Sequence, residues 1–143
     1  MSARAFNPAK WFPSAAYRKA GLIVVTEHLQ GTAPATAGNY GQFYIAPYKC
    51  VVLSIDESHG TASSSGTLQV EKLTSGQAKD AGTDLLSSTI STAATADTPQ
   101  SGTLVTTAAS VQLALGDRLG LVNGGTLTSG ADLCVTVVLC PIN

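Results

Sequence analysis

The β character of the chain is plainest in ADLCVTVVLCPI, residues 131–142. Two sets of side chains alternate along it, which is the period-two pattern of a β-strand: Leu133, Val135, Val137 and Leu139 on one face, and Cys134, Thr136, Val138 and Cys140 on the other. Both sets are mostly apolar, and in an antiparallel sheet this predicts a strand covered on both faces. One face meets the core of the domain. The other is covered by a long loop or by a second copy of the chain.

Short apolar runs of the same kind recur from residue 21 onward, separated by glycine and Gly/Ser/Thr clusters. This spacing is typical of an all-β sandwich or barrel. We expect strands near residues 22–29, 42–46, 49–56, 67–73, 84–92, 102–106, 110–115, 118–122 and 131–140. No segment carries a capped apolar stripe of helical period. The length of 143 residues suits one domain, here residues 21–143 after a separate N-terminal segment.

Alternation also assigns faces within single strands. Val51, Leu53 and Ile55 share one face of the strand predicted at 49–56, and Val111, Leu113 and Leu115 share one face of the strand at 110–115. A turn is expected at Gly116-Asp117, because glycine tolerates positive φ and aspartate can bond to nearby backbone. All eight aromatic residues lie at or before Tyr48, which predicts a core of aliphatic side chains.

The first twenty residues differ from the rest in charge and in aromatic content. They hold four basic and no acidic residues, hence +4, whereas residues 21–143 hold four basic and nine acidic residues, hence −5. They also hold half of the aromatic side chains. Pro8 and Pro13 favour an extended chain. We predict an extended arm that docks on a partner through its aromatic and basic side chains, the types that dominate interface energies: Arg4, Phe6, Lys10, Trp11, Phe12, Tyr17, Arg18 and Lys19. The alternative is an arm that packs back over residues 40–48.

Composition argues against several classes of function. The acidic body would be repelled by a phosphate backbone, so nucleic acid is not expected as a partner. No apolar run approaches the length of a membrane span, and no apolar segment follows the basic N-terminus as in a signal peptide. Three cysteines without a short Cys-x-x-Cys spacing argue against a disulfide framework or a zinc site, and we predict free thiols: Cys50, Cys134 and Cys140.

No arrangement of residues carries recognisable catalytic chemistry. Asp56, Ser58 and His59 are too close in sequence to orient one another as a triad, and residues 56–60 are better explained as a polar hairpin tip than as a metal site. Asp80 and Asp84 lie in a polar loop with no environment for a general acid. GDRLGLVNGG, residues 116–125, lacks the ending of a phosphate loop. We therefore predict a protein that is not an enzyme, with no metal and no cofactor.

Three stretches in order resemble the head decoration (cement) and head-fibre proteins of tailed bacteriophages: GTLQVEKLT at 66–74, GDRL at 116–119 and VTVVL at 135–139. The resemblance covers roughly residues 60–140 and excludes the arm. It implies a jelly-roll-like antiparallel β-sandwich that forms a homotrimer on the outer surface of a capsid. Gly116 and Asp117 match the pattern as fold features and not as a binding site.

Together these arguments predict a structural virion protein on the capsid exterior, assembled in the host cytoplasm and attached to the major capsid protein. Three arms on one trimer would bind with a high effective concentration. The expected trimer interface is the last strand: Leu133, Val135, Val137, Val138 and Leu139. The alternative function is a receptor- or carbohydrate-binding jelly roll of a phage tail or head fibre, with a glycan as ligand.

Overall fold

The alternating segments form two antiparallel sheets that lie face to face in the computed structural model, which describes residues 21–32 and 41–142, without the side chains of residues 30–32. One sheet runs in the order β1-β10-β3-β7, with β8 also paired to β3. Its strands are β1 (Ile23–Thr32), β3 (Cys50–Ser58), β7 (Gln100–Ser101), β8 (Gln112–Leu113) and β10 (Ala131–Pro141). We call this sheet A.

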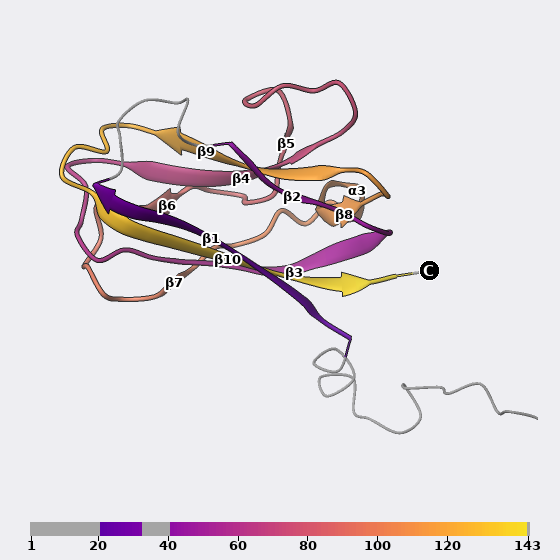
Figure 1. Ribbon diagram of the computed structural model, residues 1–143, viewed down its shortest axis with the longest axis horizontal. Helices are drawn as coiled ribbons and strands as arrows, with labels where there is room; N and C mark the ends of the chain where they lie inside the picture. The colour runs from indigo at the N-terminus through magenta and orange to yellow at the C-terminus, as the bar shows by residue number, and fades with distance from the viewer. Residues whose placement is uncertain (1–20, 33–40, 143) are drawn as a thin grey trace, which may run out of the picture.

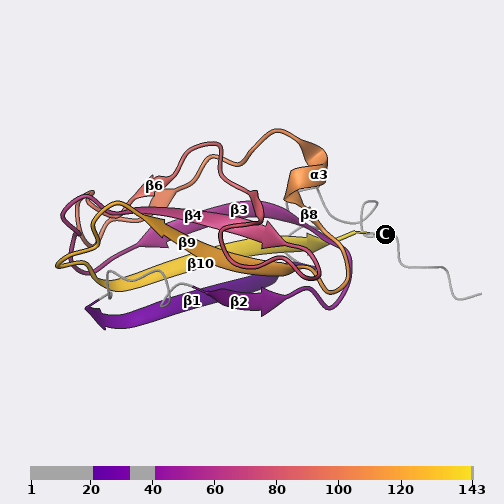
Figure 2. The same ribbon diagram turned by 90° about the horizontal axis from the view of Figure 1, so that it is seen from above.

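Sheet B runs in the order β2-β9-β4-β5, with β6 also paired to β4. Its strands are β2 (Gln42–Ile45), β4 (Thr67–Leu73), β5 (Thr83–Asp84), β6 (Ile90–Ser91) and β9 (Arg118–Gly124). Figures 1 and 2 show sheet B lying over sheet A. Because the long strands β1, β2, β3 and β4 alternate between the sheets, as do β8, β9 and β10, the fold is an all-β, jelly-roll-like sandwich, as predicted.

The core lies between the sheets and is aliphatic, as the position of the aromatic residues predicts. Its fully buried members come from both sheets, for example Val135 and Val137 of β10 with Val70 of β4 and Leu121 of β9. Phe43 and Tyr44 pack against the edge of this cluster. None of the described residues belongs to a helix long and apolar enough to cross a bilayer.

The face assignment predicted for β3 is wrong because the strand contains a bulge. Val138 of β10 pairs with Ser54, but the next residue, Leu139, pairs with Val52, so one residue of β3 has no direct partner. Cys50 and Val52 are buried before the bulge and Ile55 after it. A bulge reverses the alternation of a strand, and Val51 therefore lies opposite Ile55 and not beside it.

The segment between β4 and β9 contains less strand than predicted. Only two-residue strands stand within the predicted strand at 84–92, and the segment at 102–106 contributes a single bridge between Leu86 and Leu104. The predicted strand at 110–115 begins instead with the short helix α3 (Ala108–Val111) before β8. Leu115, predicted to share a buried face with Leu113, is 74% exposed because it belongs to the following turn.

The turn before β9 has the predicted geometry. Gly116 adopts a positive φ of 87°, and the Asp117 carboxylate accepts a hydrogen bond of 2.8 Å from the backbone N–H of Ala114. Backbone hydrogen bonds also connect this turn to Ala46 after β2, whose carbonyl accepts from Gly116 N–H at 2.9 Å. The turn thus fixes one end of the sandwich.

Candidate functional site

The residues of the predicted docking arm lie outside the described residues. These are Arg4, Phe6, Lys10, Trp11, Phe12, Tyr17, Arg18 and Lys19. The described chain begins at Gly21, immediately before β1. The candidate interaction surface is therefore sought on the β-sandwich, among the exposed side chains near the start of β1.

The predicted trimer interface needs correction for four of its five residues. Leu133, Val135, Val137 and Leu139 are 0–3% exposed, because this face of β10 packs against sheet B within the single chain. No second copy can reach these side chains in the folded protein. Val138 points to the opposite face and is half-buried, so it is the one member of the set that a second chain could contact.

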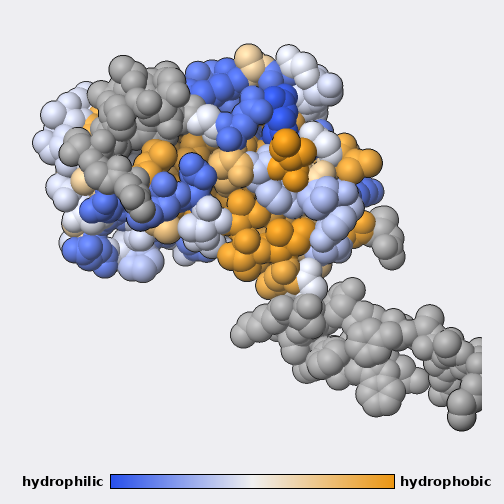
Figure 3. All heavy atoms as spheres, viewed as in Figure 1, coloured by the Kyte–Doolittle hydropathy of each residue, from blue (hydrophilic) through white to orange (hydrophobic). Residues whose placement is uncertain are grey.

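Val138 belongs to an apolar patch on the outer face of sheet A, which we call the outer-face patch: Val24, Val51, Val138 and Cys140. Val138 pairs across the strands with Val24, and Cys140 pairs with Val51. The Val24 side chain is 62% exposed, whereas the other three are half-buried. Figure 3 shows hydrophobic side chains gathered over the first half of β1. The sheet therefore presents an apolar surface beside the point where the arm joins.

Further along the same face the side chains become polar. Thr26 of β1 and Thr136 of β10 share a hydrogen bond of 3.2 Å. On β3, the Asp56 carboxylate accepts a hydrogen bond of 2.6 Å from Ser101. The apolar part of the outer face is thus confined to the end of the sandwich where β1 begins.

That end also carries three exposed apolar side chains, one at the end of β2 and two from the turns that follow β2 and β8. Ile45 is 66% exposed, Tyr48 48% and Leu115 74%. Tyr48 lies two residues before the start of β3, which pairs with the end of β10. Isolated exposed apolar residues are ordinary in soluble proteins, but several at one end indicate a contact surface.

Two polar residues of the stretch GTLQVEKLT, residues 66–74, hold neighbouring loop segments by side-chain hydrogen bonds. The buried amide of Gln69 donates to the Leu86 carbonyl at 3.1 Å and accepts from the Leu86 N–H at 3.0 Å, in the manner of a strand partner. Both oxygens of the buried Glu71 carboxylate accept backbone N–H groups, from Asp80 at 3.0 Å and Gly82 at 2.9 Å. These side-chain hydrogen bonds join β4 to residues 80–86, where few backbone hydrogen bonds of a β-ladder are formed.

Two basic residues of the same pattern hold further loop segments. The Lys72 ammonium donates to the Ala109 carbonyl in α3 at 2.6 Å. The Arg118 guanidinium, from GDRL, donates to the carbonyls of Thr74 and Gln77 at 2.7 and 2.8 Å. The residues that carry the resemblance therefore determine how the long segment after β4 is fastened to sheet B. They do not form a catalytic arrangement.

Residues 56–60, interpreted from sequence as a polar hairpin tip, instead contain a buried polar pair, Glu57 and His59, at the end of β3. Glu57 is 2% exposed and His59 3%. His59 Nδ1 lies 2.8 Å from Glu57 Oε1, and its Nε2 lies 3.0 Å from the Ala94 carbonyl oxygen. The other Glu57 oxygen accepts from the Gln100 amide at 2.7 Å. After the bulge, alternation from Ile55 places Glu57 and His59 inward, which is the signal that would have found this cluster.

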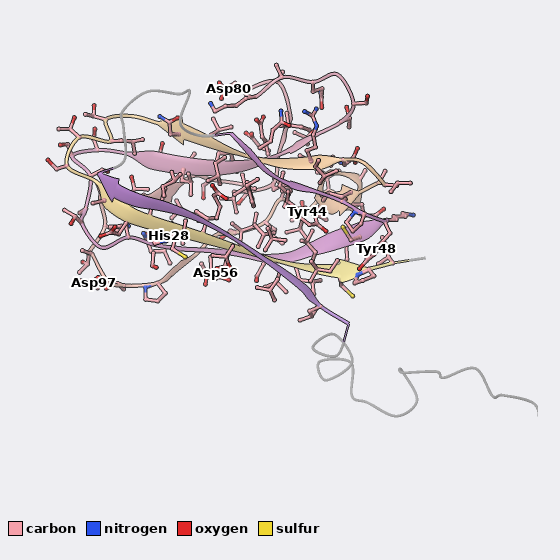
Figure 4. All side chains as sticks on the ribbon, viewed as in Figure 1. His28, Tyr44, Tyr48, Asp56, Asp80 and Asp97 are labelled. Carbon is pink, nitrogen blue, oxygen red and sulfur yellow. The ribbon has the colours of Figure 1, made fainter. Side chains whose placement is uncertain are left out.

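A groove of about 440 Å³ lies beside this cluster. Its wall includes His28, Ser58, His59, Asp97, Asp132 and Cys134. Figure 4 shows His28 and Asp97 toward one end of the sandwich and Tyr48 toward the other.

Among the described residues, no group of three or more His, Cys, Asp or Glu side chains is placed to hold a metal ion. Asp80 and Asp84, the two aspartates considered from sequence, have different surroundings. The Asp80 carboxylate is paired with Lys79 at 3.0 Å, and Asp84 lies in β5.

Comparison with models of protein families, with curated proteins and with solved structures finds no match for this chain.

Proposed function

We propose that this protein is a non-enzymatic structural component of a tailed-phage virion, which decorates the outer surface of the capsid as a homotrimer and attaches through its N-terminal arm. The observation that carries the proposal is the part played by Gln69, Glu71, Lys72 and Arg118. In the sequence they belong to the stretches that resemble phage decoration and head-fibre proteins, and in the fold they hold the loop segments by hydrogen bonds. Residues that hold loops to a sheet are part of what determines a fold. Their presence in the resembling stretches therefore supports a β-sandwich similar to that of the decoration proteins.

The surface of the body supports attachment at the end where the arm joins. The outer-face patch and the exposed Ile45, Tyr48 and Leu115 are gathered there. An arm with four aromatic residues and a charge of +4 adds buried anchors and electrostatic attraction to an acidic shell. Charges at a rim set mostly the association rate, whereas buried aromatic anchors supply affinity.

Contact between copies is assigned in this proposal to the outer-face patch and not to the inner face of β10. Val138 and Val24 lie side by side there, and Val24 is largely exposed. Burying such side chains against another copy removes apolar area from water. Three copies would then bring three arms to neighbouring capsid subunits.

The proposal is tested by adding the purified protein to empty capsids of the parent virion. The mass of the free protein should correspond to a trimer, and electron microscopy should show added density at fixed, symmetry-related positions on the capsid exterior. A protein that is monomeric and leaves the capsids bare at high concentration would contradict the proposal.

A second candidate function is the recognition of a receptor or carbohydrate by the sandwich itself. It is favoured by the open groove, whose carboxylates and hydroxyl group are suited to sugar hydroxyls: Asp97, Asp132 and Ser58. No aromatic side chain is among the described residues that line it, although stacking rings are a usual part of such sites. Binding to a glycan array by a chain lacking residues 1–20 would favour this candidate.

A further inference from the structure

His59 is a buried histidine with hydrogen-bond acceptors at both ring nitrogens. A backbone carbonyl can only accept, so the 3.0 Å contact with Ala94 requires a proton on Nε2. An ionised carboxylate can also only accept, so the 2.8 Å contact with Glu57 requires a proton on Nδ1. Gln100 donates to the second Glu57 oxygen, so both carboxylate oxygens serve as acceptors. The geometry therefore fits an imidazolium paired with a carboxylate.

Loss of one proton would leave this arrangement unsatisfied. A neutral imidazole has a single N–H, so one of its nitrogens would point a lone pair at an acceptor. An unsatisfied polar group in a buried site is costly, and His59 and Glu57 are both almost fully buried. The contacts with Glu57 and Ala94 cannot both persist after deprotonation.

The segment fastened by these contacts, residues 93–99, lies between Thr92, which is bonded to Ser63 and Gly66, and Gln100 of β7, which pairs with β3. The Ala94 carbonyl contacts the His59 imidazole, and Asp97 donates its backbone N–H to the His59 carbonyl at 2.8 Å. Asp97 also contributes to the wall of the groove. Residues 93–99 thus form part of the groove wall, and these polar contacts hold them to the end of β3.

We propose that Glu57 and His59 form a pH-dependent clasp, which closes residues 93–99 onto β3 while His59 is protonated and loosens them when it is not. The clasp would change the width of the groove, because the segment that it releases includes part of the groove wall. Protonation of a single buried histidine is thereby coupled to the shape of an accessible surface.

The titratable groups around His59 come from four parts of the fold. Glu57 lies on β3 itself, Asp97 on the fastened segment, Asp132 and Cys134 on β10 and His28 on β1. Burial lowers the pKa of His59, but the hydrogen bonds to Glu57 and Ala94 and the negative charges of Glu57 and Asp97 outweigh it and raise the pKa above its ordinary 6.5.

The sign of the pH effect follows from that direction. A histidine whose pKa is higher in the folded than in the unfolded state contributes stability that is fully present below about pH 6.5. The contribution is lost as the pH rises through the folded pKa. The same linkage applies to local opening: for each unit by which the pKa of His59 in the closed form exceeds its pKa in the open form, the equilibrium constant for closure changes about tenfold.

The test compares three full-length proteins between about pH 5.5 and 8.5: the wild type, Glu57→Gln and His28→Gln. In Glu57→Gln, the introduced amide can donate to a neutral His59 and still accept from Gln100, so every group keeps a partner without a charge. His28→Gln is the matched control, since it removes the other histidine, which is exposed on β1 beside the same groove.

We expect the amide protection factors of residues 94–98, which correct for the intrinsic pH dependence of exchange, to fall at least threefold with rising pH in the wild type and in His28→Gln. In Glu57→Gln they should be flat. Equal slopes in the wild type and Glu57→Gln, or a slope abolished by His28→Gln, would overturn the proposal. If Glu57→Gln fails to fold, the ring ¹⁵N chemical shifts of His59 in the wild-type protein provide the test. Both ring nitrogens should be protonated at pH 6.5, and a neutral ring with a single N–H at that pH would overturn the proposal.

Discussion

Lysine at Val137 and lysine at Val138 should have opposite consequences, because neighbouring residues of β10 face opposite sides of sheet A. Val137 is fully buried between its cross-strand partners Val25 and Ile55. Val138 is half-buried in the outer-face patch. Val137→Lys therefore tests the core, and Val138→Lys tests the contact between copies.

The expected cost of Val137→Lys has two parts. Loss of the buried valine removes about 1.5–3 kcal/mol, and an ammonium without a partner in an apolar site adds several kcal/mol, or must lose its proton. A total of about 4 kcal/mol or more is a large share of the roughly 5–15 kcal/mol that stabilises a domain. At Val138 the lysine can extend its ammonium into water, and the cost to the fold should be below about 1 kcal/mol.

The assay is light scattering after size exclusion, with thermal unfolding followed by circular dichroism. Val138→Lys should unfold within a few degrees of the wild type but elute as a monomer, because its charges would be buried between copies. Thr136→Lys is the matched control, on the polar part of the same face of β10, and should stay trimeric. A trimeric Val138→Lys protein would refute the outer-face contact, and a Val137→Lys protein of wild-type stability would refute the assignment of faces.

Two further outcomes follow from the buried polar groups and the thiols. Glu71→Gln should lower the free energy of unfolding by about 1–3 kcal/mol in chemical denaturation, because an amide has one oxygen for the two N–H groups that the carboxylate accepts; an unchanged midpoint would contradict the tethering role. Cys50, Cys134 and Cys140 are free thiols in the structure, and titration of denatured, unreduced protein should find about three reactive groups. In the native protein Cys50 should react slowest, because burial and the nearby Asp117 raise the pKa of its thiol; finding one reactive group after denaturation would indicate a disulfide.

The strands predicted best from sequence are β4, β9 and β10, whose predicted ranges of 67–73, 118–122 and 131–140 lie close to the observed ones. In β10 the buried side chains follow a period of two from Leu133 to Leu139, and a shift of one residue would turn this set away from the core. In β4 and β9 a shorter alternation between the flanking turns is enough to place the strand: Leu68 and Val70 in β4, and Leu119 and Leu121 in β9. The aliphatic core was predictable for a similar reason, since no aromatic side chain follows Tyr48.

The errors arise where an interaction distant in sequence determines the local structure. The bulge in β3 is a response to the register with β10, and nothing in the residues around Leu53 marks it. The apolar content of residues 84–92, 102–106 and 110–115 predicts strands, but little of this region forms a strand, and Gln69, Glu71 and Lys72 hold parts of it through side-chain hydrogen bonds. The Glu57–His59 pair was missed because a run of polar residues is usually a solvated turn, and burial was evident only after the bulge was known.

The sequence does not decide which face of β10 would meet another copy in the proposed trimer, since both faces are mostly apolar. The structure places four of the five predicted interface residues in the core and leaves Val138 outside. The apolar character of both faces of β10 therefore reflects a central strand, with one face in the core and an apolar patch on the other. Charge patterning likewise separates residues 1–20 from the body without determining what they bind.

Attachment through the arm is tested most directly by the capsid occupancy of a chain lacking residues 1–20, compared with that of the full-length protein. We predict that the shortened chain forms a folded trimer that no longer binds capsids, and that Trp11→Ala lowers the affinity about 30-fold by the loss of one anchor of about 2 kcal/mol. If the arm instead packs on its own body, the deletion should lower the melting temperature, and Trp11→Ala should reduce stability and not binding. Full occupancy of the capsid by the shortened chain would contradict attachment through the arm.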